Sequence, residues 1–279
     1  MSLRINNNSP SMMASHNLQS VMKQMNSVQE RLTTGRKINR ASDGPASLVI
    51  GRRFEAQLVG ISQAKKNVEN AVNLMNTADK TLETVEDLLI KAKALALDSM
   101  DGTKSAAQRT ANDQELAEII SSIDRIAGNT RFGDTQLLDG SFTSKSFQVG
   151  DTAGATVSVT LNDMQAEELN VEHGTDDGEI SIATASDAAD ALSAIDAAID
   201  TVTAERGRIG GITSNTFQTT LANLSIQEEN IEAARSTIMD SDYEKDTAEF
   251  QRLQVRMQVA AFMLQSTSQQ SGLVLNLFG

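Results

Sequence analysis

The chain has 279 residues, a net charge of −13, no cysteine, no tryptophan and only 3% aromatic residues. Without cysteine there is no disulfide framework, thiolate metal site or cysteine nucleophile, and two histidines are too few for a three-histidine zinc site. Scarce aromatic side chains argue against a nucleic-acid stacking surface, and the longest uncharged apolar run, of six residues from Val259 to Leu264, is too short for membrane insertion.

The first predicted element is a helix over residues 11–34. Its apolar residues recur at heptad spacing, which is typical of a helix that packs along one side against another helix. This stripe consists of Leu18, Val21, Met25, Val28 and Leu32. Gly35 ends the helix, and Asp43-Gly44-Pro45 precedes the next one, because proline suits the first turn of a helix.

A second, much longer helix is predicted over residues 46–98. Its apolar stripe runs from Ile61 to Ala96 in steps of three and four without a miss. At 1.5 Å per residue this helix is roughly 80 Å long, so the pattern predicts an elongated molecule. A third helix follows Asp101-Gly102 and ends near Gly128.

The middle of the chain has a different pattern. Residues 155–162 alternate between apolar and polar side chains, which predicts a strand. Phe147 and Val149 precede this strand across residues 150–154, so a β-hairpin is expected there. We assign all β structure to residues 141–182 and expect strands nowhere else.

Two further helical segments complete the chain. One begins near Ser186 or Asp187, either of which could serve as the N-cap. We expect it to continue through Gly207, Gly210 and Gly211, because no proline lies nearby. The last helix again has a heptad-like stripe, which consists of Phe250, Leu253, Met257, Ala260 and Leu264.

These elements predict a mainly α fold, an elongated antiparallel helical bundle with terminal coiled-coil helices and a small β-hairpin region in the middle. We divide the chain into residues 1–44, 45–182 with the hairpin at about 141–182, 183–239 and 240–279. Each terminal helix has one narrow apolar stripe and is marginally stable alone in water, so it requires a partner. This requirement favours a subunit of a polymer, held together at a seam between the two terminal stripes.

Charged clusters do not predict catalysis. Asp240, Asp242, Glu244 and Asp246 lack the glycine and terminal glutamate of a calcium loop, and we interpret them as a capping turn between two helices. His16 and His173 belong to no recognisable triad. We therefore predict no catalytic residue, no metal ligand and no cofactor, and we do not expect an enzyme.

A basic run near the N-terminus contrasts with the acidic middle of the chain. It consists of Arg31, Arg36, Lys37 and Arg40. Because no aromatic residues accompany it, we interpret it as a salt-bridging surface within an assembly rather than a nucleic-acid site. The turn before the last helix offers acidic partners such as Asp240, Asp242 and Glu244.

Several sequence blocks resemble the bacterial flagellin family. They are residues 32–43 (LTTGRKINRASD), 57–64 (QLVGISQA), 123–132 (IDRIAGNTRF), 229–236 (ENIEAARS) and the apolar ending 273–277 (LVLNL). The resemblance covers roughly residues 1–140 and 190–279. It implies a short flagellin without additional outer domains, in which segments 1–44 and 240–279 form the inner layer of the flagellar filament. Segments 45–182 and 183–239 then form its outer helical layer.

The same resemblance implies the partners and the location. The chain is expected to polymerise with itself into an extracellular filament for swimming, and to meet an export chaperone, the filament cap and hook-associated proteins. Export through the flagellar channel agrees with the first thirty residues, which show no apolar core of a cleaved signal peptide.

The family also implies contact with a Toll-like innate receptor, through an arginine, a leucine and a glutamate. The matching positions here are Lys91, Leu95 and Glu115. Lysine keeps the charge of arginine but lacks its planar fork, so recognition is expected to be weaker.

Two other functions remain open at this point. A hook–filament junction protein of the flagellum shares the terminal blocks, although its middle is usually longer and more divergent. A surface adhesin could use residues 141–182, but that segment lacks the aromatic side chains that bind sugars.

Overall fold

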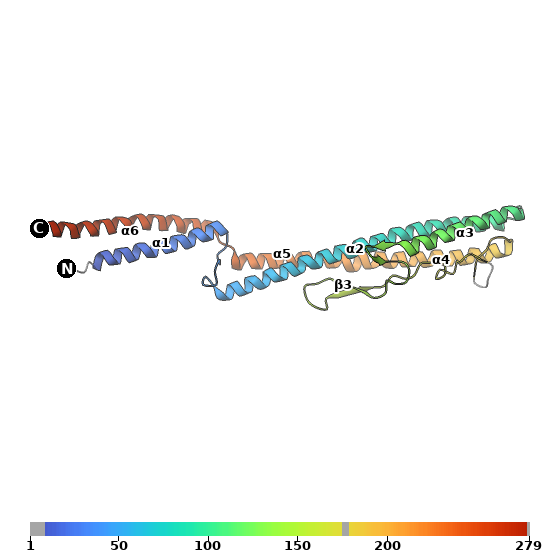
Figure 1. Cartoon of the computed structure of the whole chain (residues 1–279), viewed down its shortest axis with the longest axis horizontal. Coiled ribbons are helices and arrows are strands. Elements are labelled where there is room, and N and C mark those ends of the chain that lie inside the picture. The colour runs from blue at the N-terminus through green and yellow to red at the C-terminus, as the bar shows by residue number, and fades with distance from the viewer. Residues whose placement is uncertain (1–8, 175–178, 278–279) are drawn as a thin grey trace. The chain divides into compact units, whose positions relative to one another are not determined.

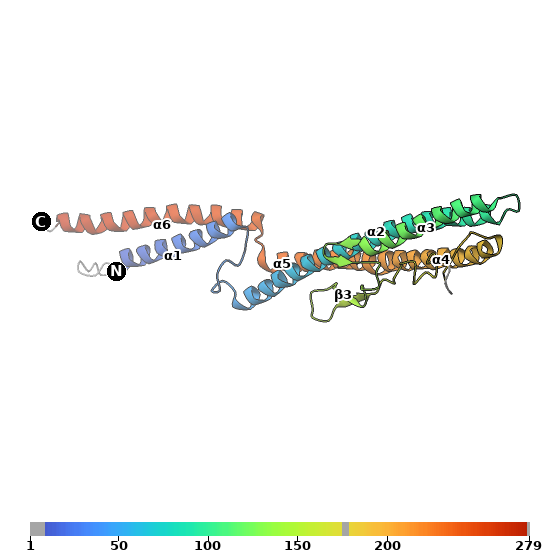
Figure 2. The same cartoon turned by 45° about the vertical axis from the view of Figure 1, so that its right-hand side comes forward.

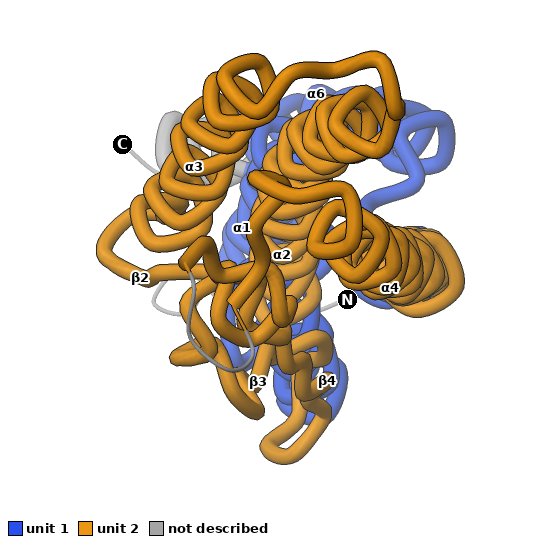
Figure 3. Tube along the Cα trace, turned by 90° about the vertical axis from the view of Figure 1, so that its right-hand side faces the viewer, with its two compact units in different colours: residues 1–58, 229–279 blue, residues 59–228 orange. Residues whose placement is uncertain are grey.

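The computed structural model describes residues 9–174 and 179–277. The chain divides into two compact units, which Figure 3 shows in two colours. Unit 1 comprises residues 1–58 and 229–279, and unit 2 comprises residues 59–228. The boundaries predicted at residues 44 and 240 do not coincide with the boundaries of these units but lie at helix ends. The assignment of the predicted segments to filament layers stays a prediction.

Unit 1 is built on the two terminal helices, α1 (Ser9–Thr34) and α6 (Tyr243–Leu277). They lie side by side and run antiparallel, as Figures 1 and 2 both show. The unit also holds the start of α2 (Pro45–Met100) and the end of α5 (Thr219–Met239). The predicted coiled-coil arrangement of the terminal helices is thus confirmed.

The segment that follows α1 and the segment between α5 and α6 are joined by backbone hydrogen bonds. Gly35 ends α1 with a φ of +68°, and its N–H donates to the Arg31 carbonyl oxygen at 2.8 Å, a common glycine helix end. The Lys37 N–H donates to the Met239 carbonyl oxygen at 2.8 Å, and the Ser241 N–H donates to that of Gly35 at 2.9 Å. The turn after α1 is therefore fixed to the turn before α6.

Unit 2 contains most of α2 together with α3 (Ala106–Asn129), α4 (Ala185–Gly211) and the first part of α5. Every residue of the predicted stripe of α2, from Ile61 to Ala96, is buried. Leu116 and Ile123 of α3 and Ile195 and Val202 of α4 are buried with it. The long-helix prediction for residues 46–98 is confirmed to within two residues at each end.

The predicted β-hairpin is present in unit 2. Strand β3 (Lys145–Gln148) pairs antiparallel with β4 (Thr156–Val159), with Lys145 opposite Val159 and Gln148 opposite Thr156. The expectation that strands occur only within residues 141–182 was wrong. The two-residue strands β1 (Arg131–Phe132) and β2 (Thr135–Gln136) also pair, because Gly133 takes a φ of +61° and closes a tight turn between them.

The start of α4 also differs from the prediction. Its N-cap is Thr184, not Ser186 or Asp187, and the Asp187 N–H donates to the Thr184 side-chain oxygen at 3.2 Å. The three glycines at the end of α4 are helical, as expected. They are followed by η1 (Ile212–Gln218), a π-helical segment that leads directly into α5 and that no sequence pattern indicated.

Candidate assembly surface on the terminal helices

The predicted seam is where α1 and α6 meet. Val21 and Val28 of α1 and Leu253 of α6 are buried, and Leu253 is 0% exposed. Half-buried side chains pack against this trio: Met25, Leu32, Phe250 and Met257. The outermost seam residues, Leu18, Ala260 and Leu264, are also half-buried. All ten predicted residues therefore lie at least partly out of solvent, while their role in polymerisation stays a prediction.

An ion pair stands at the end of this seam. The Arg31 guanidinium donates to the Asp246 carboxylate at 2.8 Å and approaches Glu249 at 3.4 Å. Ser241 donates to the same Asp246 carboxylate through its hydroxyl. The hydrogen bond from Arg31 holds the pKa of the buried Asp246 carboxyl below its ordinary value, against the opposing effect of burial.

The basic run divides into paired and unpaired residues. Arg31 pairs as described and Arg40 pairs with Glu30 at 3.1 Å, but the structure shows no ion pair for Arg36 or Lys37 within the described ranges. Arg31 therefore pairs within the chain with Asp246 and Glu249 of α6 rather than with the expected Asp240, Asp242 or Glu244, and pairing of the basic run with a neighbouring copy stays a prediction.

The acidic turn caps α6, as the sequence suggested. The Lys245 N–H donates to the Asp242 carboxylate at 3.0 Å, which makes Asp242 the N-terminal cap of the helix. In the part of the chain that the structure describes, no group of three or more acidic residues and histidines is placed to hold a metal ion.

Helix α6 also carries a second apolar stripe, which was not predicted from the sequence. Val255, Val259 and Phe262 are 59%, 54% and 70% exposed. They follow one another at helical spacing, and residues two positions apart lie about 200° apart around a helix, so this stripe faces away from the seam at Leu253. The signal was present in the run from Val259 to Leu264, which served only to exclude a membrane helix. We call Val255, Val259 and Phe262 the outward stripe.

The three receptor positions lie in unit 2. Lys91 and Leu95 are on α2 and Glu115 is on α3. Lys91 and Glu115 are exposed, and Leu95 is half-buried. The hydrogen bond from the Asn112 amide to the Asp98 carboxylate, at 2.8 Å, fixes the antiparallel register of the two helices near this point.

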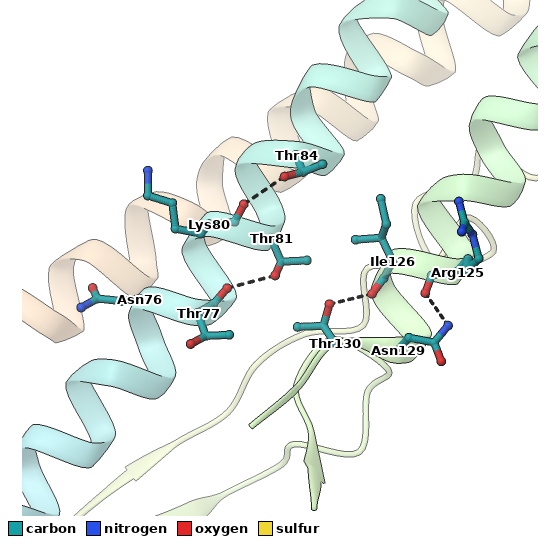
Figure 4. Close-up of a pocket in the computed structure, with 9 residues that line it drawn as sticks. All are labelled: Asn76, Thr77, Lys80, Thr81, Thr84, Arg125, Ile126, Asn129 and Thr130. Atoms are coloured by element: carbon teal, nitrogen blue, oxygen red, sulfur yellow. Dashed lines mark hydrogen bonds between the residues drawn. The ribbon is translucent and has the colours of Figure 1, made fainter. Parts of the chain in front are cut away.

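An open groove of about 910 Å³ lies between α2 and the end of α3 (Figure 4). Its threonine hydroxyls donate to backbone carbonyls of their own helices, as Thr81 does to Thr77 at 3.0 Å and Thr130 to Ile126 at 2.6 Å. Its charged lining residues are Lys80 and Arg125, both cations. The groove therefore presents no nucleophile paired with a base.

The Ser, His and Asp side chains that meet in unit 2 do not form a catalytic relay. The Asp113 carboxylate accepts from the Ser181 hydroxyl at 2.9 Å and lies 3.3 Å from the His173 imidazole. Both side chains thus face the acid, whereas a relay places the imidazole between serine and acid. Asp113 also accepts from the Ile182 N–H at 2.7 Å. This cluster therefore holds the segment that contains His173, Ser181 and Ile182 against α3.

No helix in the described ranges is both long and apolar enough to span a membrane.

Comparison with known proteins adds to these observations. Residues 5–143 match the model of the bacterial flagellin N-terminal helical region, and residues 192–278 match that of the bacterial flagellin C-terminal helical region.

Relatives of the chain carry the same family name. It is 31% identical over 273 residues to the flagellin of Halalkalibacterium halodurans, with 98% of each chain covered. It is 31% identical to flagellin FlaB1 of Treponema pallidum, covering 96% of this chain and 97% of that one, and 29% identical to the flagellin of Bacillus subtilis, covering 99% of each.

Solved structures agree on the fold. The crystal structure of Bacillus cereus flagellin matches 61% of this chain and 94% of its own, at 26% identity and a TM-score of 0.50. A putative flagellar hook-associated protein from Vibrio parahaemolyticus matches 71% of this chain with a TM-score of 0.59, and at 18% identity it shows the fold alone. With only residues 144–191 between its two matched regions, the chain belongs to the bacterial flagellin family as a short form, a structural subunit of the flagellar filament.

Proposed function

We propose that the chain polymerises into the filament through the outward stripe of α6. One observation carries this proposal: α6 uses one apolar face against α1, yet leaves Val255, Val259 and Phe262 more than half exposed on its other face. Large apolar side chains in a row on a helix that is already paired favour burial against a further copy. Each contact of this kind is modest, but it recurs at every subunit of a helical polymer.

The test separates folding from assembly. Phe262→Ser removes a side chain that is 70% exposed in the monomer, so the monomer is expected to keep its helicity and melting temperature. Polymerisation is expected to require at least tenfold more protein, since burial of one phenylalanine is worth about 2 kcal/mol. Gln254→Ser, on the flank of the same helix, is the control and should polymerise like the parent. Normal assembly of the Phe262→Ser chain would overturn the proposal.

The partners that the family implies belong to the same proposal. We propose that an export chaperone, the filament cap and hook-associated proteins meet this chain, and that it leaves the cell without a cleaved signal peptide. A filament subunit functions outside the cell, and its work is structural rather than catalytic. Neither the groove nor the Asp113 cluster pairs a nucleophile with a base.

Receptor contact is proposed on the exposure of Lys91 and Glu115. Both side chains reach solvent on neighbouring helices of unit 2, as a receptor surface requires. Substitution of Lys91 by arginine tests how strongly these positions are recognised.

A further inference from the structure

The helix that joins α4 to α5 contains a π-helical turn at Ile212–Gln218. The backbone stays right-handed helical at both junctions, with φ −63° and ψ −45° at Ile212 and φ −64° and ψ −41° at Thr219. The helix is therefore continuous. A π turn of this kind takes up an additional residue within an α-helix, and such turns are frequent at functional positions.

Three glycines stand immediately before this turn. A Cβ atom added to Gly207, Gly210 or Gly211 would meet no atom within 4 Å other than those of its chain neighbours and its own helix backbone. Close packing therefore does not explain these glycines. Glycine weakens a helix interior more than any residue except proline, so the helix is locally soft next to the π turn.

The π turn also leaves a polar group without a partner. Thr213 is 8% exposed, and its buried hydroxyl has no hydrogen bond. In a regular α-helix a threonine hydroxyl reaches the carbonyl four residues earlier, as Thr220 does to Thr216 at 2.6 Å. An α-helical register at Thr213 would thus offer it the Ile209 carbonyl, which makes the present register less than fully satisfied.

The residues that follow β4 are fastened to α4 at Glu205, before the glycines, and at Arg208, which follows the first of them. The buried Glu205 carboxylate accepts from the Asn162 amide at 3.0 Å, and it also pairs with Arg208. The Arg208 guanidinium in turn donates to the Thr160 carbonyl oxygen. This end of the hairpin therefore follows any movement of α4.

Strand β3 is fastened on the other side of the glycines, to the π turn itself. Phe217 is fully buried, and its ring lies 5.8 Å from that of Phe147 in β3, edge to face at 83°. The glycines at 207–211 lie between this contact and most of the α4 anchor. A change of helical register between the two anchors must therefore move β3 relative to α4.

We propose that residues 207–218 switch between two helical registers and that the Phe217–Phe147 contact stabilises the present one. The π turn occupies Ile212–Gln218 in this structure and moves to the glycines in the second state. The residues between the two positions then rotate by about 100°, the rotation of one residue in an α-helix. Thr213 gains its backbone partner and Phe217 leaves Phe147, so the hairpin changes its orientation on α4. The switch lies entirely within unit 2 and does not depend on the proposed polymerisation.

Single-residue deletions test whether the turn holds an extra residue. Deletion of the exposed Ser214 should convert the turn to regular α-helix while both flanking helices keep their buried faces. The melting temperature of the full chain is expected to stay or rise. Deletion of the exposed Ser225, in the regular part of α5, rotates the rest of that helix and should lower it by about 5 °C or more. Equal destabilisation by the two deletions would contradict the proposal.

The second state is tested by fluorine NMR of the unpolymerised full chain labelled with 3-fluorophenylalanine, with Phe217 assigned by Phe217→Leu. The Phe217 signal is expected to show exchange on the microsecond to millisecond timescale. It should shift toward the second state in Phe147→Leu and become a single narrow line in the Ser214 deletion. A narrow Phe217 line in the parent chain that Phe147→Leu leaves unshifted would overturn the switch.

Discussion

At the scale of single residues, Asp246 is the polar group on which the pairing of the terminal helices depends most. It is 6% exposed and takes hydrogen bonds from Arg31 and Ser241. We predict that Asp246→Asn lowers the free energy of unfolding by about 1–3 kcal/mol, because the charged hydrogen bonds are lost at a buried position. Chemical denaturation measures this. Glu244→Gln, an equal charge change at an exposed position of the same helix turn, is the control and should stay within about 0.5 kcal/mol of the parent.

The same carboxyl predicts a pH dependence. Its pKa in the folded chain is lowered by the hydrogen bond from Arg31. A lowered folded pKa means that the stabilisation is complete above the unfolded value, about 4, and is lost as the pH falls below it. The melting temperature of the parent should therefore converge on that of Asp246→Asn as the pH falls over the interval below about 4. A constant difference between the two chains over this interval would contradict this account.

The proposed receptor recognition also depends on a single residue, Lys91. Lys91 is exposed beside Leu95 on α2. Because an arginine fork can make paired hydrogen bonds that an ammonium cannot, Lys91→Arg is expected to strengthen the response of a Toll-like receptor reporter cell several-fold. Lys80→Arg, in the same helix but away from the three positions, should leave the response unchanged. An equal gain from both substitutions would remove Lys91 from the proposed contact.

At the scale of elements, regular periodicity was informative and local turn chemistry was not. The stripe of α2 predicted its burial at every position, since a long helix with one apolar face has one way to hide it. The two-residue hairpin at 131–136 is too short to show alternation, and only Gly133 indicated a turn. The N-cap at Thr184 competed with Ser186 and Asp187, which have similar capping propensity.

The π turn could not be predicted from the sequence pattern for a different reason. It changes the helical period over only seven residues, and the flanking stripes remain in phase with their own neighbours. The candidate site was predicted in the same uneven way. The heptad spacing identified the seam, whereas the outward stripe shares the same helix and cannot be assigned to a partner until the seam is known.

The burial of the seam predicts how substitutions there change the stability of the α1–α6 pair. Leu253→Ala empties a fully buried position between α1 and α6 and is expected to reduce the free energy of unfolding of the terminal pair by about 3 kcal/mol. Leu264→Ala, at the half-buried end of the seam, should cost about 1 kcal/mol or less. Hydrogen exchange of α1 and α6 measures both. Equal losses would mean that the seam is not centred on Leu253.

At the scale of the whole molecule, the exposed charges between α1 and α2 indicate a contact with a neighbouring copy. Arg36 and Lys37 are exposed, and the described part of the chain provides no ion pair for either. In a polymer they are available to acidic residues of a neighbouring copy. Reversing both charges to glutamate is expected to block polymerisation without lowering the monomer melting temperature. Unchanged filament length, measured by electron microscopy, would show that these charges contact no neighbour.

We propose that the terminal helices drive assembly of this flagellin. Negative-stain electron microscopy after salting out compares the intact chain with a chain that lacks residues 1–40 and 243–279. We predict long filaments from the intact chain and none from the truncated one. Filaments from both would contradict assembly through α1 and α6.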